Sequence, residues 1–451
     1  MDIHNEPISL HPQNPHYFIF RGEPCVLITS AEHYGAVLNL DFNYVEYLEE
    51  LYSCGLNHTR VFSGVYYELP GAFGIENNTL APKPGRYICP WIFCSIFPET
   101  IEKYDLGRWD EAYFSRLKDF CSKASELGIV IEFTLFCSYY LDKNWKISPM
   151  NIGNNINGVG NVSVNEVYTL RHQDLLKCQT ALTEKIVREL NGFDNIIFEI
   201  CNEPWADNIQ IEWEYHISDT IVLVEAGLPF KHLISWNPGI GYRAIENPNK
   251  DISIINFHYA ALPGAVAVNY ELNRVIGMNE TGFAGCSDNT YRHQAWELLM
   301  SGGALFNNLD FSFAPGYEKG TFKYSDKSPG GGSRELRSQL KILKDFICSF
   351  NFVRMVPDNS IIKGLQVMNG IGYMLAERGQ AYAMYIRASN EGVLDLDIPS
   401  GRYVVEWFSP KDGSIEKIEK MDHSHGGMRL EAPPYRDDIA LSIKRVVNGF
   451  C

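Results

Sequence analysis

Two glutamates stand where apolar strands end, and a pair of carboxyl groups in that arrangement could cleave a glycosidic bond. Glu203 follows the run IIFEICN at 196–202, and Glu280 follows VIGMN at 275–279, so an asparagine precedes each glutamate. In retaining cleavage, one carboxylic acid protonates the leaving oxygen while a second carboxylate, roughly 5 Å away, attacks the anomeric carbon. Both glutamates are therefore candidate catalytic residues, provided that the fold brings the two strand ends to one mouth.

The apolar runs belong to a repeating unit of short strand, loop and amphipathic helix. Strands that are apolar on both faces and alternate with helices indicate a parallel sheet covered by helices. Eight such units predict an α/β fold, a (β/α)8 TIM barrel with its working side chains at the carboxyl ends of the strands. An open doubly wound sheet is the alternative, although no GxGxxG follows the first strand. The predicted strands lie at 25–29, 58–62, 129–136, 195–201, 232–236, 252–257, 274–278 and 303–306, and the predicted helices at 44–52, 110–127, 171–190, 211–225, 291–300 and 334–350.

After Pro357 the pattern changes to short alternating runs that are separated by turn pairs such as Arg378-Gly379 and Asp412-Gly413. This spacing is typical of antiparallel strands joined by hairpins. We therefore predict a small antiparallel β-sandwich domain at 356–451, which follows a catalytic barrel domain at 1–355.

The stretch IIFEICNEPW at 196–205 resembles the motif at the end of the fourth strand in the retaining clan A of glycoside hydrolases. The whole chain is similar to cellulase-like members of that clan, including bacterial members that end in a small β-sandwich. The resemblance implies that Glu203 is the acid/base and that Glu280, at the end of the seventh strand, is the nucleophile.

Other positions match the clan in part. Arg60, in NHTRVFSG, resembles the arginine that keeps the nucleophile ionised. His258 and Tyr259, in INFHYA, resemble the pair whose hydroxyl contacts the nucleophile. Cys137 ends the third strand where many members carry histidine, and Asn307 lies in the eighth strand where many carry tryptophan. These departures fall in the sugar-binding part of the site, so the resemblance leaves the sugar open.

Further candidate substrate contacts come from strand ends and from one long segment. Asn202 directly precedes the candidate acid, and Trp205 and Trp236 could form aromatic platforms for a sugar ring. His33, after the first strand, could reach a hydroxyl of the terminal sugar. The aromatic segment at 64–108 is long enough to wall off one end of a cleft, which would favour action at chain ends.

The composition limits the partners. Acidic residues (55) outnumber basic ones (39), for a formal net charge of −16, and no Lys/Arg cluster stands out, so we expect neither nucleic acid nor a membrane as partner. The 11 cysteines are scattered singly, which argues against a disulfide framework, and without CxxC or HExxH we expect no metal and no cofactor. No signal peptide is visible, so we expect a cytoplasmic location if the sequence is complete, and a secreted or periplasmic one if a signal has been removed.

Together these patterns predict a retaining β-glycoside hydrolase that acts on an oligosaccharide or polysaccharide, with exo action on a galactoside, glucoside or mannoside favoured. An endo-acting cellulase-like glucanase and a catalytically silent glycan-binding protein on the same fold are the alternatives. Because a general acid must carry a proton near working pH, we expect Glu203 to titrate at a higher pH than Glu280, which Arg60 would keep ionised. The sequence leaves the sugar, the linkage and the oligomeric state open.

Overall fold

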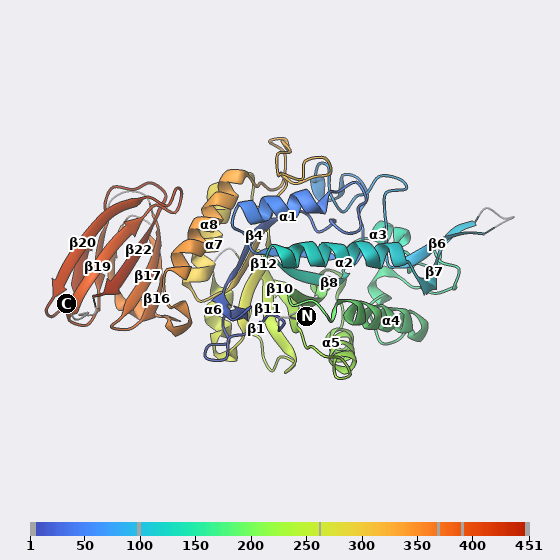
Figure 1. The fold of residues 1–451 in the computed structure, drawn as a ribbon, viewed down its shortest axis with the longest axis horizontal. Coiled ribbons are helices and arrows are strands. Elements are labelled where there is room, and N and C mark those ends of the chain that lie inside the picture. Colours follow the sequence, from blue (N-terminus) through green and yellow to red (C-terminus); the bar gives the residue numbers. More distant parts are fainter. Residues whose placement is uncertain (1–5, 97–100, 261–262, 368–369, 389–391, 447–451) are drawn as a thin grey trace.

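Eight parallel strands form a nearly closed barrel at the centre of the computed structural model (Figure 1). The strands follow one another around the sheet without the reversal of order that marks a doubly wound sheet, so the predicted barrel is confirmed. The structure describes residues 6–96, 101–260, 263–367, 370–388 and 392–446. The barrel strands are β4 (Leu27–Ala31), β5 (His58–Phe62), β8 (Val130–Cys137), β9 (Ile196–Asn202), β10 (Leu233–Ile240), β11 (Ile252–His258), β12 (Val275–Thr281) and β13 (Leu305–Leu309).

The two ends of this sheet, β4 and β5, meet through the side chain of Asn57. Its Oδ1 accepts a hydrogen bond from the Ile28 N–H at 3.0 Å, and its Nδ2 donates to the Val26 carbonyl oxygen at 2.8 Å. Every residue of β5 and of β9 is buried, as expected for strands that face the barrel interior on one side and helices on the other.

Helices surround the barrel, and polar caps mark where two of them begin. Asp110 accepts a hydrogen bond from the Ala112 N–H at the start of α2 (Glu111–Glu126), and Ser333 caps α8 (Arg334–Cys348) in the same way. Gly128 follows the end of α2 with a φ of +68°, the left-handed conformation that glycine commonly adopts where a helix ends. The other helices are α1 (Tyr44–Ser53), α3 (Asp142–Ile147), α4 (Gln173–Leu190), α5 (Ile211–Glu225), α6 (Gly264–Asn269) and α7 (Asp288–Met300).

The structure departs from the predicted elements at two places. Between β5 and α2, where we predicted a long loop, strands β6 (Trp91–Ile96) and β7 (Ile101–Trp109) form an antiparallel hairpin that projects from the barrel on the side opposite the C-terminal sheets (Figure 1). The first predicted strand is split, because β3 (Glu23–Cys25) pairs with β2 (Phe18–Phe20) in a small N-terminal sheet that also contains β1 (Ser9–Leu10).

The C-terminal region contains one six-stranded and one three-stranded antiparallel sheet, which confirms the predicted β-sandwich. The two sheets share a hydrophobic core, in which Trp407 of the larger sheet and Leu396 of the smaller one are fully buried. The strands are β14 (Val356–Pro357), β15 (Ile362–Gln366), β16 (Ile371–Glu377), β17 (Ala381–Arg387), β18 (Val393–Leu396), β19 (Gly401–Phe408), β20 (Ile415–His423), β21 (Met428–Glu431) and β22 (Asp438–Arg445). The division into domains at 1–355 and 356–451 stays a prediction, and the extreme ends of both ranges, 1–5 and 447–451, lie outside the described residues.

The six-stranded sheet packs against helix α7 through a buried ion pair. Arg292 donates from Nε and Nη2 to the two carboxylate oxygens of Asp438, at 2.9 Å each, and both side chains are 1% exposed. The Tyr385 hydroxyl donates to the same carboxylate at 2.9 Å, and its ring stacks on Trp296 with 5.4 Å between ring centroids. This buried ion pair, together with the pair of Arg387 and Glu297 at 2.9 Å, links the barrel to the C-terminal sheets.

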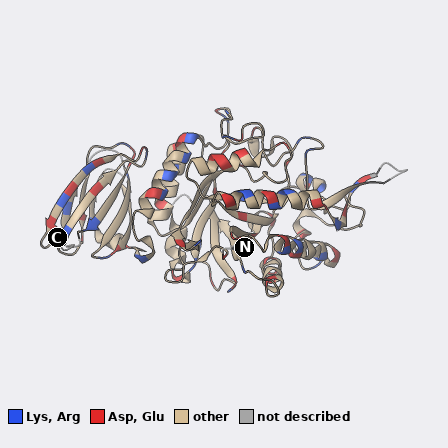
Figure 2. Ribbon diagram, viewed as in Figure 1, with Lys and Arg blue, Asp and Glu red and all other residues tan. Residues whose placement is uncertain are grey.

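Charges of both signs are interspersed on the outer elements. Figure 2 shows Lys and Arg beside Asp and Glu along α2, α8 and β20. None of the helices among the described residues is both long and apolar enough to span a membrane.

Replacing Arg292 with alanine should strongly destabilise the protein, since Asp438 would be left as a buried and unpaired charge. Loss of one partner of such a pair costs about 3–5 kcal/mol. The midpoint of urea unfolding measures this loss. Arg354→Ala is the matched control, because Arg354 is 66% exposed in its pair with Glu377 and should contribute about 0–1 kcal/mol. Equal midpoints for the two variants would contradict the prediction.

Candidate active site

Glu203 directly follows β9, in a backbone conformation that is uncommon for residues other than glycine. Its φ and ψ are +49° and +50°, in the left-handed region. Two side chains hold this turn: Asn237 accepts a hydrogen bond from the Glu203 N–H at 3.0 Å, and Ser138 donates its hydroxyl to the Glu203 carbonyl oxygen at 2.7 Å. Strain of this kind persists where the surroundings over-determine it, and it concentrates at active sites.

Glu280 lies near the end of β12 and has a donor on each carboxylate oxygen. Arg60 Nη1 donates to Oε2 at 3.0 Å, and the Tyr259 hydroxyl donates to Oε1 at 2.5 Å. The side chain is 6% exposed. Arg60 therefore places a positive charge beside this carboxylate, and Tyr259 fixes its orientation.

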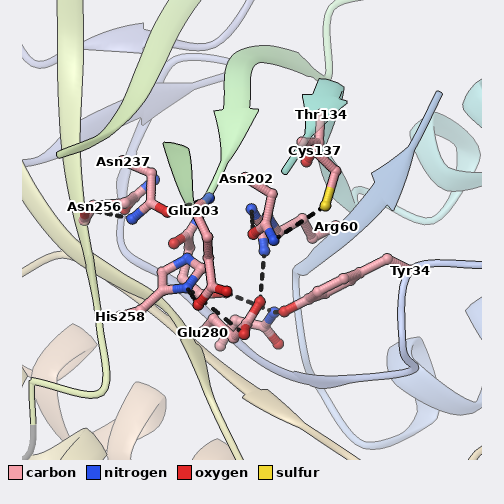
Figure 3. A network of polar contacts seen from close by, with 12 residues as sticks. Tyr34, Arg60, Thr134, Cys137, Asn202, Glu203, Asn237, Asn256, His258 and Glu280 are labelled. Atoms are coloured by element: carbon pink, nitrogen blue, oxygen red, sulfur yellow. Dashed lines mark hydrogen bonds and ion pairs between the residues drawn. The ribbon is translucent and has the colours of Figure 1, made fainter. Parts of the chain in front are cut away.

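His258, the last residue of β11, lies between the two glutamates (Figure 3). Its Nδ1 is 2.8 Å from Oε1 of Glu203 and 3.6 Å from Oε1 of Glu280. One carboxylate oxygen of each glutamate and a ring nitrogen of His258 lie within 4.8 Å of one another. The fold thus brings the two strand-end carboxylates together, as the sequence analysis predicted.

Burial and neighbouring charges act in opposite directions on the pKa values of Glu203 and His258. Burial would raise the pKa of Glu203, but the hydrogen bond and charge of His258, with a further contribution from Arg60, outweigh burial and lower the pKa. Burial would lower the pKa of His258, but the charges of Glu280 and Glu203 outweigh burial and raise it. Both shifts favour the charged forms of Glu203 and His258, whereas a general acid must carry a proton near working pH.

Arg60 also organises the barrel interior below the two glutamates. Its Nε and Nη2 donate to Oε2 of Glu199 at 2.8 and 2.5 Å, and Nη2 donates to Oδ1 of Asn202 at 2.7 Å. Asn279 joins this layer by donating to Glu199 at 2.9 Å and to Glu132 at 3.1 Å. Burial, followed by the charge of Glu199, raises the pKa of Glu132 to about 7. The buried guanidinium of Arg60 thus bonds directly to two buried acids, Glu199 and Glu280.

Two cavities meet at the glutamates. The inner pocket has about 350 Å³ of empty volume and is lined by both Glu203 and Glu280. The outer groove, about 950 Å³, is more open and is lined by Glu203 but not by Glu280. The residues that line both cavities are Phe73, Tyr140, Glu203, Tyr259 and Phe283.

Most of the residues predicted to contact substrate lie at these cavities. Asn202 and His33 line the inner pocket, Trp205 lines the outer groove, and Tyr259 lines both. Arg60 contacts the pocket through its hydrogen bonds to Glu280 and Asn202.

Two predicted contacts are placed elsewhere. Trp236 is 4% exposed and donates its indole N–H to Glu214 of α5 at 2.5 Å, so it faces the helices and not the mouth. Asn307 is fully buried and donates to the Tyr34 hydroxyl at 3.4 Å and to the Asn279 carbonyl oxygen at 3.0 Å. Its contact with the pocket is therefore indirect, through Tyr34.

Three aromatic residues and one acid of the pocket were not predicted. They are Phe62, Glu68, Tyr140 and Phe283, whereas Tyr66 and Phe73 lie in the aromatic segment that we expected to wall off one end of the cleft. Three aromatic residues of the pocket, Tyr34, Phe73 and Tyr140, have a φ between +53° and +62°. Glu203 and Tyr259 also have left-handed φ values. The position of aromatic and polar residues close to a strand end could have indicated some of these residues. Their left-handed backbone conformations could not be predicted, because the residue types are not those that usually adopt them.

The chain shares its fold with glycoside hydrolases of known structure. One, described as a glycoside hydrolase, is 16% identical, with 98% of this chain and 97% of that chain covered and a TM-score of 0.64. A glycoside hydrolase family 5 protein from Bacteroides vulgatus ATCC 8482 is 15% identical, with coverage of 97% and 94% and a TM-score of 0.66. The noncanonic maltogenic α-amylase AmyB from Thermotoga neapolitana is 12% identical, with coverage of 93% and 99% and a TM-score of 0.51. At these identities the likeness establishes the fold and leaves the substrate open.

The C-terminal region has a match of its own. Residues 356–442 match a family described as "Putative collagen-binding domain of a collagenase". No curated protein sequence matches the chain.

Removing the imidazole of His258 should raise the pKa of Glu203, because burial then acts without the opposing hydrogen bond and charge. Carbon NMR of the labelled carboxyl group measures this pKa in His258→Gln, and the signal of Glu203 is the one that is lost in Glu203→Gln. His425→Gln, an exposed histidine replacement, should leave the titration unchanged. An unchanged or lowered pKa of Glu203 in His258→Gln would contradict the electrostatic account.

Proposed function

We propose that the protein is a retaining β-glycosidase that removes a terminal sugar from a glycan or glycoside. The observation that carries this proposal is the pair Glu203 and Glu280, with carboxylate oxygens less than 4.8 Å apart at the mouth of a barrel. Retaining enzymes place their carboxyl groups about 5–5.5 Å apart, whereas inverting enzymes leave about 6.5–9.5 Å for a water molecule. The short separation favours double displacement.

The two cavities support a division of roles between the glutamates. Glu203 faces both cavities, and Glu280 faces the inner pocket alone. An acid that protonates the leaving oxygen must lie at the junction between the sugar and its leaving group, while a nucleophile needs only to reach the anomeric carbon. We therefore assign Glu203 as the acid/base and Glu280 as the nucleophile, with the sugar in the inner pocket and the leaving group in the outer groove.

In the first step an oxygen of Glu280 attacks the anomeric carbon, the glycosidic C–O bond breaks, and the leaving oxygen takes a proton from Glu203. His258 Nδ1 lies 2.8 Å from Oε1 of Glu203, so this hydrogen bond can deliver the proton that Glu203 needs before this step. In the second step Glu203 accepts a proton from water, whose oxygen attacks the anomeric carbon and displaces Glu280. The sugar leaves with its configuration retained.

The inner pocket, which is less open than the outer groove, supports exo action. Tyr66, Glu68 and Leu80, which line the inner pocket alone, all belong to the long segment between β5 and α2. An endo-acting enzyme needs an open cleft on both sides of the scissile bond, and here the inner side is the more enclosed one. A silent glycan-binding protein is less well supported, because both carboxylates are present with their hydrogen-bond partners.

Azide should separate the two roles by the configuration of the product. With Glu280→Gly, azide attacks the anomeric carbon of an aryl β-glycoside directly, and a single displacement gives the α-glycosyl azide. With Glu203→Ala, which should lose roughly 10²- to 10⁴-fold in rate, azide displaces the covalent intermediate and gives the β-glycosyl azide. Proton NMR distinguishes the anomers. Glu271→Gly, an exposed control, should keep its activity without azide, and swapped anomers would exchange the assigned roles.

Exo action should appear in the order of products. An oligosaccharide labelled at its reducing end should become shorter by one sugar at a time, because only the non-reducing end fits the closed pocket. Chromatography of an early time course measures this. Labelled fragments of many lengths appearing together from the start would indicate endo cleavage.

A further inference from the structure

The inner pocket contains a buried carboxylate that the cleavage steps do not use. Glu68 lines this pocket and is 3% exposed. Glu203 and Tyr259 line both cavities, whereas Glu68 and His33 line the inner pocket alone. Glu68 is therefore on the side away from the outer groove, and it faces the part of the sugar that is farthest from the leaving group.

Three donors hold Glu68 in place. The Tyr66 hydroxyl donates to Oε1 at 3.1 Å, His33 Nε2 lies 3.4 Å from the same oxygen, and Asn78 Nδ2 donates to Oε2. Asn78 is itself fixed, because its Oδ1 accepts a hydrogen bond from the Leu80 N–H at 2.8 Å. A carboxylate has about four acceptor positions, so one remains for a ligand.

His33 adds a complementary group beside this carboxylate. Its Nδ1 is buried and has no hydrogen-bond partner in the part of the chain that the structure describes. Burial would lower the pKa of His33, but the charge and hydrogen bond of Glu68 outweigh burial and raise it. His33 and Glu68 both line the inner pocket, so an unused ring nitrogen and an unused carboxylate acceptor position belong to adjacent residues there. A hydroxyl group both donates and accepts hydrogen bonds, so a sugar hydroxyl can bond to Glu68 and to His33.

We propose that Glu68 selects the terminal sugar by accepting a hydrogen bond from a hydroxyl group on its far side. The preferred substrates are glycosides whose terminal sugar is uncharged, because a uronic acid would bring a second negative charge into the same small pocket. Glu68 is thus a specificity-determining residue from the long segment and not from a barrel strand. This inference rests on the proposed glycosidase function.

Deoxy sugars test the hydrogen bond directly. The probes are the aryl β-glycoside that the wild-type protein cleaves fastest and its 3-, 4- and 6-deoxy analogues. In wild type, one analogue should lose roughly 10- to 100-fold in kcat/KM, the loss expected for a hydrogen bond to a charged group. In Glu68→Ala the parent glycoside should lose a similar factor, and that analogue should lose nothing further. If the analogue loses as much in Glu68→Ala as in wild type, the inference is overturned while the glycosidase stands.

Two further variants guard against a merely structural effect. Glu68→Gln keeps the shape of the side chain and should raise the rate on the matching uronide relative to the neutral glycoside by roughly tenfold, since it removes one negative charge. Glu76→Gln is the matched control, because Glu76 lies in the same segment, is exposed and accepts hydrogen bonds from Ser325. It should keep the wild-type pattern on every probe, and an equal change in the uronide ratio in both variants would overturn the inference.

Binding separates this inference from the proposed function. Calorimetry with the free parent sugar and its deoxy forms should give the same Glu68-dependent pattern as the kinetics. Absence of turnover together with that pattern would overturn the glycosidase and support the role of Glu68. Turnover together with equal binding of all the sugars by wild type and Glu68→Ala would overturn the role of Glu68.

Discussion

The buried guanidinium of Arg60 is the interaction on which the site depends. It has no exposed surface, and a charge so placed costs several kcal/mol unless it is paired and hydrogen-bonded. Glu199 and Asn202 of β9 and Glu280 of β12 accept its hydrogen bonds, and the ring of Tyr34 lies 4.7 Å from it. Since β5, β9 and β12 are not neighbours in the sheet, this one cation fixes the relative positions of the strand ends that lead into the two glutamates.

The barrel strands and the long segment between β5 and α2 supply different groups to the site. The barrel strands supply the carboxylates and the groups that orient them, whereas the long segment between β5 and α2 closes the pocket and supplies Glu68. Among the described residues, none that lines either cavity comes from the C-terminal sheets. Those sheets are joined to the barrel by the ion pair of Arg292 on α7 and Asp438 on β22.

The strand-end residues could be predicted from sequence because buried parallel strands have an unbroken apolar pattern, and their carboxyl ends share one face. That argument led to Glu203 and Glu280, whereas Arg60 was predicted from the family resemblance. It was wrong for Trp236, since successive residues of a strand face opposite sides and its neighbour Ser235 is the one that reaches into the barrel, at 2.6 Å from Glu132. The segment at 64–108 was expected to wall off one end of the cleft, but the left-handed backbone of Phe73 within it could not be predicted, because such turns at residues other than glycine are imposed by tertiary packing.

The central claim is that Glu280 forms a covalent bond to the sugar, and mass spectrometry tests it most directly. A 2-deoxy-2-fluoro aryl β-glycoside with a good leaving group slows the second displacement, so the intermediate accumulates on wild-type protein. The account predicts a mass increase of one fluorosugar, carried by the peptide that contains residues 275–285. A label on Glu203, or release of a sugar with inverted configuration and no labelled protein, would contradict it.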